Sequence, residues 1–174
     1  MKKNRSLKKL AVIISDHLFK NGINAVLSGG ACVTLYTQNK YISYDLDFVL
    51  LSHMDSKKIK KVMREIGFRQ EGKYFKHEGT PYFVDFLSPP LSVGEEPVKE
   101  ISEIKEGKKT LRLLSPTDCV KDRLAAFYHW NDKQSLEQAV LVCNNQQVDL
   151  TEVQRWSRNE GMSQKYEVFK DDLK

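Results

Sequence analysis

The segment that most constrains this chain is YDLDFVLL at residues 44–51, in which two aspartates alternate with large apolar side chains. A period of two is typical of a β-strand, and it places Asp45 and Asp47 on one face, with Cα atoms about 6.5–7 Å apart. A carboxylate on an otherwise apolar strand costs free energy unless a cation meets it. The sequence therefore predicts a cation at this strand, unless the two aspartates only begin the strand and cap the turn before it.

A third carboxylate, Asp85, lies in YFVDFL, where its immediate neighbours are apolar. If its strand lies beside the 44–51 strand, Asp45, Asp47 and Asp85 converge on one spot. Carboxylate oxygens together with substrate phosphates suit Mg²⁺. Two such ions about 3.5–4 Å apart would hold the attacking and leaving oxygens of a phosphoryl-type transfer. The three carboxylates together favour this metal site over a role in capping a turn.

A Ser28-Gly29-Gly30 turn follows the strand candidate INAVLS at 23–28 and precedes a helical stretch at about 31–39. Glycine lets the backbone approach a ligand closely, and a helix N-terminus offers free N–H groups to an anion. Tight turns also use glycine for geometry alone, so the turn by itself leaves both readings open. The sequence contains neither the P-loop nor the dinucleotide-binding glycine pattern.

The rest of the chain predicts an α+β fold, a mixed sheet flanked by helices with a helical C-terminal part. Helices are expected at Ser6–Asn21, after a cap at Asp55, and after the SPTD motif that begins at Ser115. Short alternating runs between residues 67 and 114 predict a β-meander and a hairpin. The expected organisation is an α/β core at residues 1–114 and a helical segment at 115–174 packed on it as one compact unit.

Bulk properties fit a single globular domain of 174 residues with a net charge of +5, which moderately favours polyanionic partners. Three widely spaced cysteines predict neither a disulfide framework nor a zinc site. The apolar run near the N-terminus is too short for a signal peptide, and no segment approaches the length of a membrane span. We therefore expect a cytoplasmic protein that does not enter a membrane.

These motifs resemble the nucleotidyltransferase superfamily of the DNA polymerase β type over roughly residues 23–140. The resemblance rests on the Ser28-Gly29-Gly30 turn, the Asp45-Leu46-Asp47-Phe48 strand and the later Asp85. More narrowly, LLSPTDCVKDRLAAFYHWNDKQSLEQA is similar to the small AbiEii-type and minimal nucleotidyltransferases. Those relatives commonly have an arginine and a hydroxyl residue before the first aspartate. Here Ser43 keeps the hydroxyl, but Tyr41 occupies the position of the arginine.

The resemblance implies transfer of a nucleoside monophosphate from a nucleoside triphosphate to a hydroxyl of RNA, most plausibly tRNA, or of a protein. It makes Asp45, Asp47 and Asp85 the catalytic, metal-binding residues for two Mg²⁺ ions. A further set would bind the nucleotide: Ser28, Gly29, Gly30, Ser43, Lys121 and Arg123. Either Lys121 or Arg123 is expected to reach the triphosphate. The alternative is that the residue is only a surface cation.

Relatives of this kind also occur in toxin–antitoxin pairs, so a cognate toxin or antitoxin is an expected partner. A different class of function stays open at this point. A non-catalytic module could keep the fold and use its basic surface to bind RNA or a partner protein. Mg²⁺-dependent nucleotide binding would distinguish the enzyme from such a module.

Overall fold

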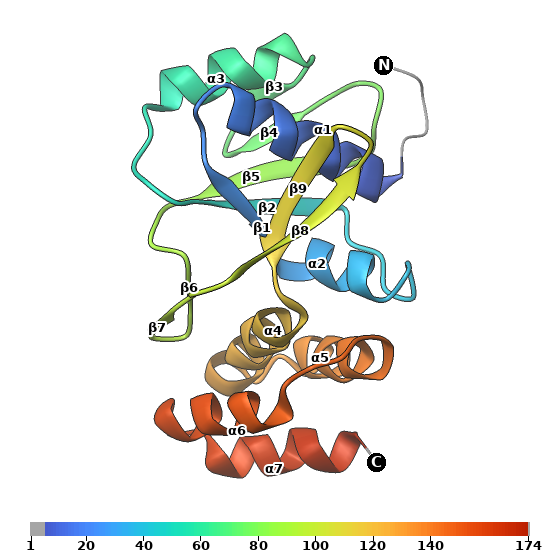
Figure 1. Ribbon diagram of the computed structural model, residues 1–174, viewed down its shortest axis with the longest axis vertical. Coiled ribbons are helices and arrows are strands. Elements are labelled where there is room, and N and C mark those ends of the chain that lie inside the picture. Colours follow the sequence, from blue (N-terminus) through green and yellow to red (C-terminus); the bar gives the residue numbers. More distant parts are fainter. Residues whose placement is uncertain (1–5, 174) are drawn as a thin grey trace.

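The computed structural model describes residues 6–173, which form a mixed β-sheet with helices around it and a helical layer below (Figure 1). The α+β fold with a mixed sheet is therefore confirmed. The helices are α1 (Leu7–Lys20), α2 (Gly29–Tyr36), α3 (Ser56–Glu65), α4 (Pro116–Trp130), α5 (Lys133–Asn145), α6 (Leu150–Asn159) and α7 (Ser163–Asp172). The strands are β1 (Ala25–Ser28), β2 (Asp45–Leu50), β3 (Arg69–Glu71), β4 (Tyr74–Lys76), β5 (Phe83–Leu87), β6 (Ser92–Val93), β7 (Glu96–Pro97), β8 (Ile101–Glu106) and β9 (Lys109–Leu114).

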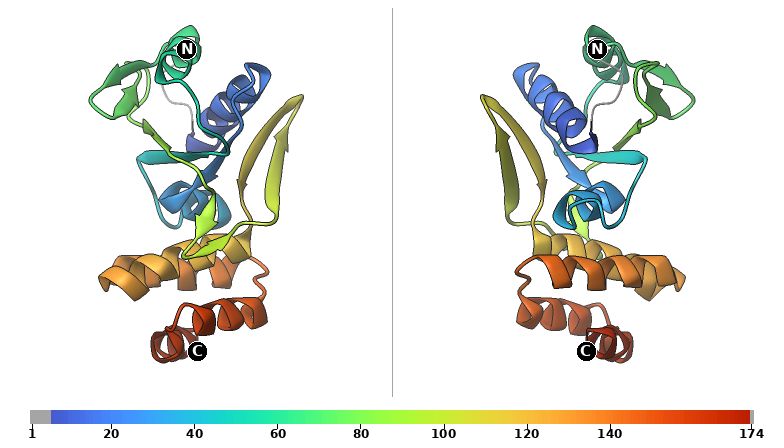
Figure 2. Two further views of the ribbon diagram at one scale, coloured as in Figure 1. Left: turned by 90° about the vertical axis from the view of Figure 1, so that its left-hand side faces the viewer. Right: turned by 90° about the vertical axis from the view of Figure 1, so that its right-hand side faces the viewer.

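The main sheet has seven strands in the order β3-β4-β5-β2-β1-β9-β8. β2 pairs with β5 in parallel and β1 pairs with β9 in parallel, while the remaining neighbours are antiparallel. The meander and the hairpin that the sequence predicts, the latter across residues 98–115, are confirmed as β3-β4-β5 and β8-β9. Figure 2 shows these two groups at opposite edges of the sheet.

One face of the central strands is apolar and supports the core. Leu46, Phe48 and Val84 are fully buried there, in the cluster that also holds the apolar stripe of α1 and the buried side of α3. Because strand side chains alternate, the residues between them must emerge on the opposite face. The core thus determines which face of the sheet carries the aspartates.

Two local differences from the sequence prediction have conformational causes. The helix expected at about 31–39 runs from Gly29 to Tyr36, and it is followed by Gln38 and Asn39, whose φ angles of 52° and 66° cannot continue a helix. A small second sheet, β6-β7, was not predicted, because its two-residue strands are too short for an alternating pattern.

The C-terminal helices begin as their sequence indicates. The Ser115 hydroxyl accepts the Asp118 backbone N–H at 3.1 Å, and Pro116 occupies the first turn of α4. α4 and α5 pack against each other and against α2, and α6 and α7 lie beneath them (Figure 2). α2 thereby connects the sheet to the helical part.

A buried aromatic pair joins the helical part to the strands. Trp156 of α6 is fully buried and stacks on Tyr128 of α4 with ring centroids 5.6 Å apart. Its indole N–H donates to the Val93 carbonyl of β6 at 3.1 Å.

Among the described residues, no helix is both long and apolar enough to cross a membrane.

Candidate functional site

Strand pairing places the three predicted carboxylates on one face of the sheet. Asp47 pairs directly with Asp85 across the parallel β2-β5 ladder, and on its other side it pairs with Ser28 across the antiparallel β1-β2 ladder. Asp45 lies two residues before Asp47 and therefore points to the same side. The hypothesis that the Asp85 strand adjoins the 44–51 strand is confirmed. We call Asp45, Asp47 and Asp85 the carboxylate centre.

The carboxylate centre is crowded with negative charge. Asp45 is exposed, Asp47 is half-buried and Asp85 is buried. Burial, and then the neighbouring charges of Asp85 and Asp45, raise the pKa of Asp47 to about 6. Arg123 acts in the opposite direction on the Asp47 pKa, which brings α4 within electrostatic reach of the centre.

The diglycine turn packs directly onto this centre. Gly29 has φ +67°, and a Cβ atom there would lie 2.7 Å from Oδ2 of Asp47. Gly30 is close to Ser43 and Tyr41, at 3.2 and 3.3 Å from its virtual Cβ. The Ser28 hydroxyl donates to the Asp47 carbonyl at 3.3 Å and makes no side-chain cap for α2. The backbone at the start of α2 thus packs closely on Asp47, and a side chain at Gly29 would displace the Asp47 carboxylate.

Ser43 organises the start of β2. Its hydroxyl accepts the Asp45 N–H at 3.2 Å and donates to the Asp45 carbonyl at 3.0 Å. Its own N–H donates to the Thr34 hydroxyl of α2 at 2.9 Å. These bonds fix the backbone that carries Asp45 relative to α2, while a contact between Ser43 and a nucleotide stays a prediction.

The structure separates the two basic residues that the sequence left as alternatives. Arg123 is bonded to Asp122 through Nε at 3.1 Å and Nη2 at 2.5 Å, and its Nη1 lies 3.4 Å from Oε1 of Gln138. Its charge lowers the Asp47 pKa, whereas Lys121 is not among the causes of that shift. Asp122 is a neighbour of the centre that sequence reasoning missed, since its charge also raises the Asp47 pKa.

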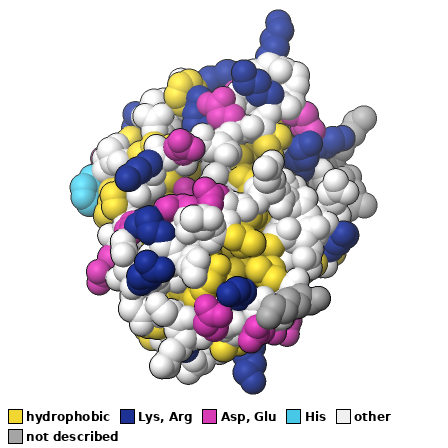
Figure 3. Space-filling model, turned by 60° about the horizontal axis from the view of Figure 1, so that its bottom comes forward, with side chains coloured by type: hydrophobic (Ala, Val, Ile, Leu, Met, Phe, Trp, Pro, Cys, Tyr) yellow, Lys and Arg dark blue, Asp and Glu magenta, His cyan; other side chains and the backbone are white. Residues whose placement is uncertain are grey.

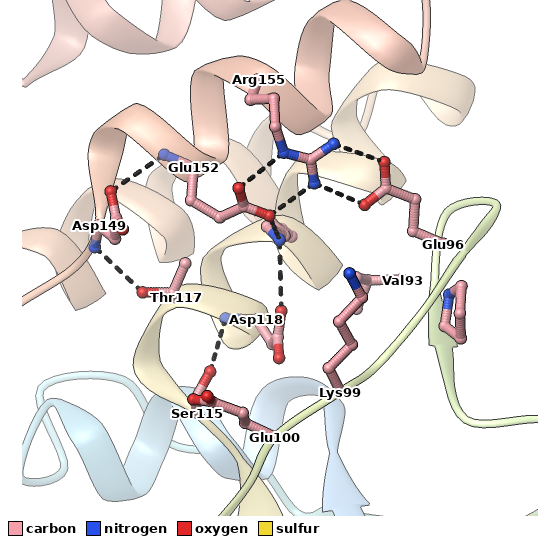
Figure 4. Close-up of a pocket in the computed structure, with 12 residues that line it drawn as sticks. Val93, Glu96, Lys99, Glu100, Ser115, Thr117, Asp118, Asp149, Glu152 and Arg155 are labelled. Carbon is pink, nitrogen blue, oxygen red and sulfur yellow. Dashed lines mark hydrogen bonds and ion pairs between the residues drawn. The ribbon is translucent and has the colours of Figure 1, made fainter.

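Lys121 lies in a different place. Its ammonium is buried, with Oε1 of Glu152 at 2.8 Å and Oδ1 of Asp118 at 3.5 Å. These residues line a pocket of about 400 Å³ between α4, α6 and the β6-β7 segment, in which Arg155 bridges Glu152 and Glu96 (Figure 4). This pocket and the carboxylate centre share no residue. A role for Lys121 at the triphosphate stays a prediction, and its position favours Arg123.

A cation that sequence reasoning missed approaches the centre from the β3-β4 turn. Nζ of Lys73 lies 3.2 Å from Oδ2 of Asp85 and 4.7 Å from the centroid of the Tyr74 ring. The Lys73 side chain is 66% exposed, whereas that of Asp85 is 9% exposed, so removal of Lys73 would leave a buried carboxylate for another cation to meet. Gly72 separates two of the short runs in the sequence, but only the strand pairing directs the β3-β4 turn toward Asp85.

The carboxylate centre offers hard oxygen donors of the kind that Mg²⁺ prefers. Within residues 6–173, however, no three His, Cys, Asp or Glu side chains already stand in an arrangement that could hold a metal ion.

The face that Figure 3 brings forward shows acidic and basic side chains interspersed rather than a field of one sign.

Comparison with solved structures supports the architecture at low sequence identity. The chain is similar to an antigenic nucleotidyltransferase-like protein from Paracoccidioides brasiliensis, with a TM-score of 0.64, 14% identity, and 99% of this chain and 94% of that chain covered. The chain has the nucleotidyltransferase fold.

Two structures of the antibiotic-resistance factor ANT(2″)-Ia are also similar. The complex with adenylyl-2″-tobramycin has a TM-score of 0.55 and 12% identity, with 92% and 98% of the two chains covered. The solution structure has a TM-score of 0.53 and 12% identity, with 94% and 96% covered. The sequence matches no protein-family model and no curated protein.

Gly29→Ala should destabilise the protein more than Gly107→Ala does. Both glycines have positive φ, but a Cβ at Gly107 meets open space, whereas at Gly29 it meets Oδ2 of Asp47. We expect about 1 kcal/mol of backbone cost for Gly107→Ala and about 1–2 kcal/mol more for Gly29→Ala. Urea unfolding of both variants measures the difference, and equal losses would contradict the close packing of the turn on Asp47.

Asp47→Asn should stabilise the protein at neutral pH. The folded-state pKa of Asp47, about 6, lies above the ordinary value of 3.8, so the folded state binds this proton more tightly than the unfolded state. The wild type then loses stability as pH rises from about 4 to about 6, by about 1–3 kcal/mol, and the neutral amide avoids this loss.

Thermal melts at about pH 4 and pH 7.5 test this expectation. The variant should melt a few degrees above wild type at the higher pH and close to it at the lower pH. Glu137→Gln, which neutralises an exposed carboxylate of α5, is the matched control. A variant that is less stable than wild type at pH 7.5 would contradict the assignment.

Proposed function

We propose that this protein is a metal-dependent nucleotidyltransferase. It moves a nucleoside monophosphate from a nucleoside triphosphate to a hydroxyl of RNA, most plausibly tRNA, or of a protein. The observation that carries the proposal is the pairing of Asp47 with Asp85 beside the Gly29-Gly30 turn. Carboxylates and a helix N-terminus at one place suit a nucleotide whose phosphates arrive with a divalent cation.

The fit of this site to Mg²⁺ rests on its donors and its charge. Burial, and then the charges of Asp85 and Asp45, raise the pKa of Asp47, and a cation bound there would favour its charged form. The carboxylates would have to close around the ion, and Asp85 would have to exchange its contact with Lys73. Asp45, Asp47 and Asp85 would hold two Mg²⁺ ions, which when bound would neutralise charge on the phosphates and on the attacking and leaving oxygens.

The chain's own groups would position the reactants. The N–H groups at Gly29 and Gly30 would donate to the triphosphate, and Arg123 would face it from α4. The acceptor oxygen would form a bond to the α-phosphorus while the bond between the α- and β-phosphates breaks and pyrophosphate leaves. Asp85 would take the acceptor's proton. Positioning and charge neutralisation carry most of such a reaction, so no nucleophilic side chain is required.

The resemblance of residues 113–139 to AbiEii-type and minimal nucleotidyltransferases supports a toxin–antitoxin setting, with the cognate toxin or antitoxin as a partner. Because nucleoside triphosphates and RNA or protein acceptors occur in the cytoplasm, we place the activity there. The similar fold of ANT(2″)-Ia, solved with adenylyl-2″-tobramycin, makes an aminoglycoside hydroxyl a necessary comparison among acceptors.

Asp85→Asn should abolish transfer without unfolding the protein, because the amide keeps the size of the side chain and loses the negative charge. Purified protein would be incubated with Mg²⁺ and each α-labelled nucleoside triphosphate. The acceptor would be total tRNA, lysate protein or tobramycin. We expect label on RNA or protein, reduced at least about 100-fold in Asp85→Asn and in Asp45→Asn/Asp47→Asn. Glu137→Gln is the control for an exposed carboxylate.

A binding readout separates the enzyme from a non-catalytic module. The wild type should bind nucleoside triphosphate more tightly with Mg²⁺ than with EDTA, and Mg²⁺ should raise its melting temperature less after Asp47→Asn. The absence of label with every nucleotide, together with Mg²⁺-independent nucleotide binding, would overturn the proposal. Full transfer activity in Asp85→Asn would show that Asp85 does not belong to the catalytic site.

A further inference from the structure

We propose that the face of the sheet from β5 to β3 is the acceptor surface, and that it holds a single-stranded RNA end. This inference rests on the proposed function and names its acceptor class and location. We call the surface formed by Arg69, Lys73, Tyr74, Lys76 and Phe83 the acceptor platform. It adjoins Asp85 at the edge of the sheet that Figure 2 shows opposite β8-β9.

Strand pairing places the platform on the same face as the carboxylate centre. Phe75 pairs with Val84 in the antiparallel β4-β5 ladder, so one step along it Tyr74 lies opposite Asp85 and Lys76 lies opposite Phe83. Arg69 pairs with Lys76 across β3-β4. Asp45 pairs with Phe83 across β2-β5. A row of paired residues therefore crosses the sheet from Asp45 through Phe83 to the two cations Lys76 and Arg69.

The rings and cations of the platform are interleaved. The Tyr74 and Phe83 rings have centroids 5.9 Å apart, and both side chains are half-buried. Nζ of Lys73 lies over the Tyr74 ring at 4.7 Å, and Nζ of Lys76 lies over the Phe83 ring at 5.3 Å. Proteins that hold single-stranded nucleic acid combine aromatic faces, on which bases stack, with cations that follow the backbone.

The platform begins at the reacting groups. Nζ of Lys73 lies 3.2 Å from Oδ2 of Asp85, the carboxylate proposed to take the acceptor's proton. A phosphate bound by Lys73 would therefore lie next to the terminal hydroxyl that reacts. Since Lys73 is largely exposed, it can exchange Asp85 for a phosphate oxygen. This position therefore suits the end of an RNA strand rather than the middle of a duplex.

Positive charge continues away from Asp85 beyond the platform. Arg69 lines two hollows, one with Lys76 and Phe83 and the other with Lys60 and Arg64 of α3. Residues 55–78 contain eight lysines and arginines and four acidic residues, so they carry +4 of the chain's net +5. Glu71, which pairs with Lys76 at 2.9 Å, and Glu78 offset part of this charge locally. This excess of positive charge favours a polyanion over a protein as the molecule that bears the acceptor hydroxyl.

The test measures RNA binding separately from nucleotide binding. A labelled single-stranded RNA of about ten nucleotides, a length within single-strand site sizes, would be titrated by fluorescence anisotropy without triphosphate. Arg69→Gln/Lys76→Gln should weaken binding about 10-fold and flatten the salt dependence by about 1.4 in log–log slope. Lys105→Gln/Lys108→Gln, which removes two exposed lysines at the β8-β9 hairpin on the opposite edge, should leave both unchanged.

A second variant pair tests the rings. Tyr74→Leu should weaken RNA binding about 10-fold through lost stacking, while Tyr82→Leu, on the alternate face of the β5 region, should not. Each variant should bind Mg²⁺ and triphosphate as wild type does, which shows that it is folded. In the transfer assay the platform variants should raise the KM for RNA and leave the KM for triphosphate unchanged.

Two outcomes would overturn the inference while the proposed function stands. One is wild-type transfer to a protein or to tobramycin with no measurable RNA binding. The other is equal weakening of RNA binding by Lys105→Gln/Lys108→Gln, which would show a diffuse charge effect. RNA binding that behaves as expected, without Mg²⁺-dependent triphosphate binding, would instead overturn the proposed function and keep the platform.

Discussion

The parallel pairing of β2 with β5 is the contact on which the site depends. It places Asp47 beside Asp85, two like charges that would separate in a flexible chain. The pairing persists because the reverse sides of the same strands, among them Leu46, Phe48 and Val84, are fully buried in the core. A one-residue slip would turn those apolar groups to the carboxylate face. Hydrophobic burial thus holds together charges that oppose each other.

Two cations offset this repulsion. Lys73 approaches Asp85 from the β3-β4 turn, and Arg123 acts on Asp47 from α4. Burial and the charges of Asp85 and Asp45 still raise the pKa of Asp47 to about 6. A further cation would meet this charge directly at Asp47, whereas at Asp85 it would replace Lys73.

The sequence was sufficient for features that depend on local patterns. Alternation revealed which side of β2 carries Asp45 and Asp47, and the caps Ser115 and Asp55 located the starts of α4 and α3. Asp85 could be selected because a carboxylate within an apolar run is unusual. Its actual position beside Asp47 required a non-local strand pairing, which the sequence could only suggest.

Features that depend on tertiary geometry escaped the sequence. Lys121 and Arg123 are two residues apart on α4 and therefore face nearly opposite sides of the helix, so only its packing against α2 and α6 decides which one approaches Asp47. Lys73 gave no signal because its contact with Asp85 arises from the path of the β3-β4 turn. The β6-β7 hairpin was too short for any pattern to reveal.

The sheet face is divided between a centre that the core fixes and an edge that the core constrains less. The carboxylate centre lies on β2 and the adjoining β5, where the register is set by the buried core. Arg69, Lys73, Tyr74 and Lys76 lie on the short edge strands β3 and β4 and the turn between them, where side chains can change without disturbing that core. In this chain that edge is cationic and aromatic, which is the composition on which the proposed acceptor platform rests.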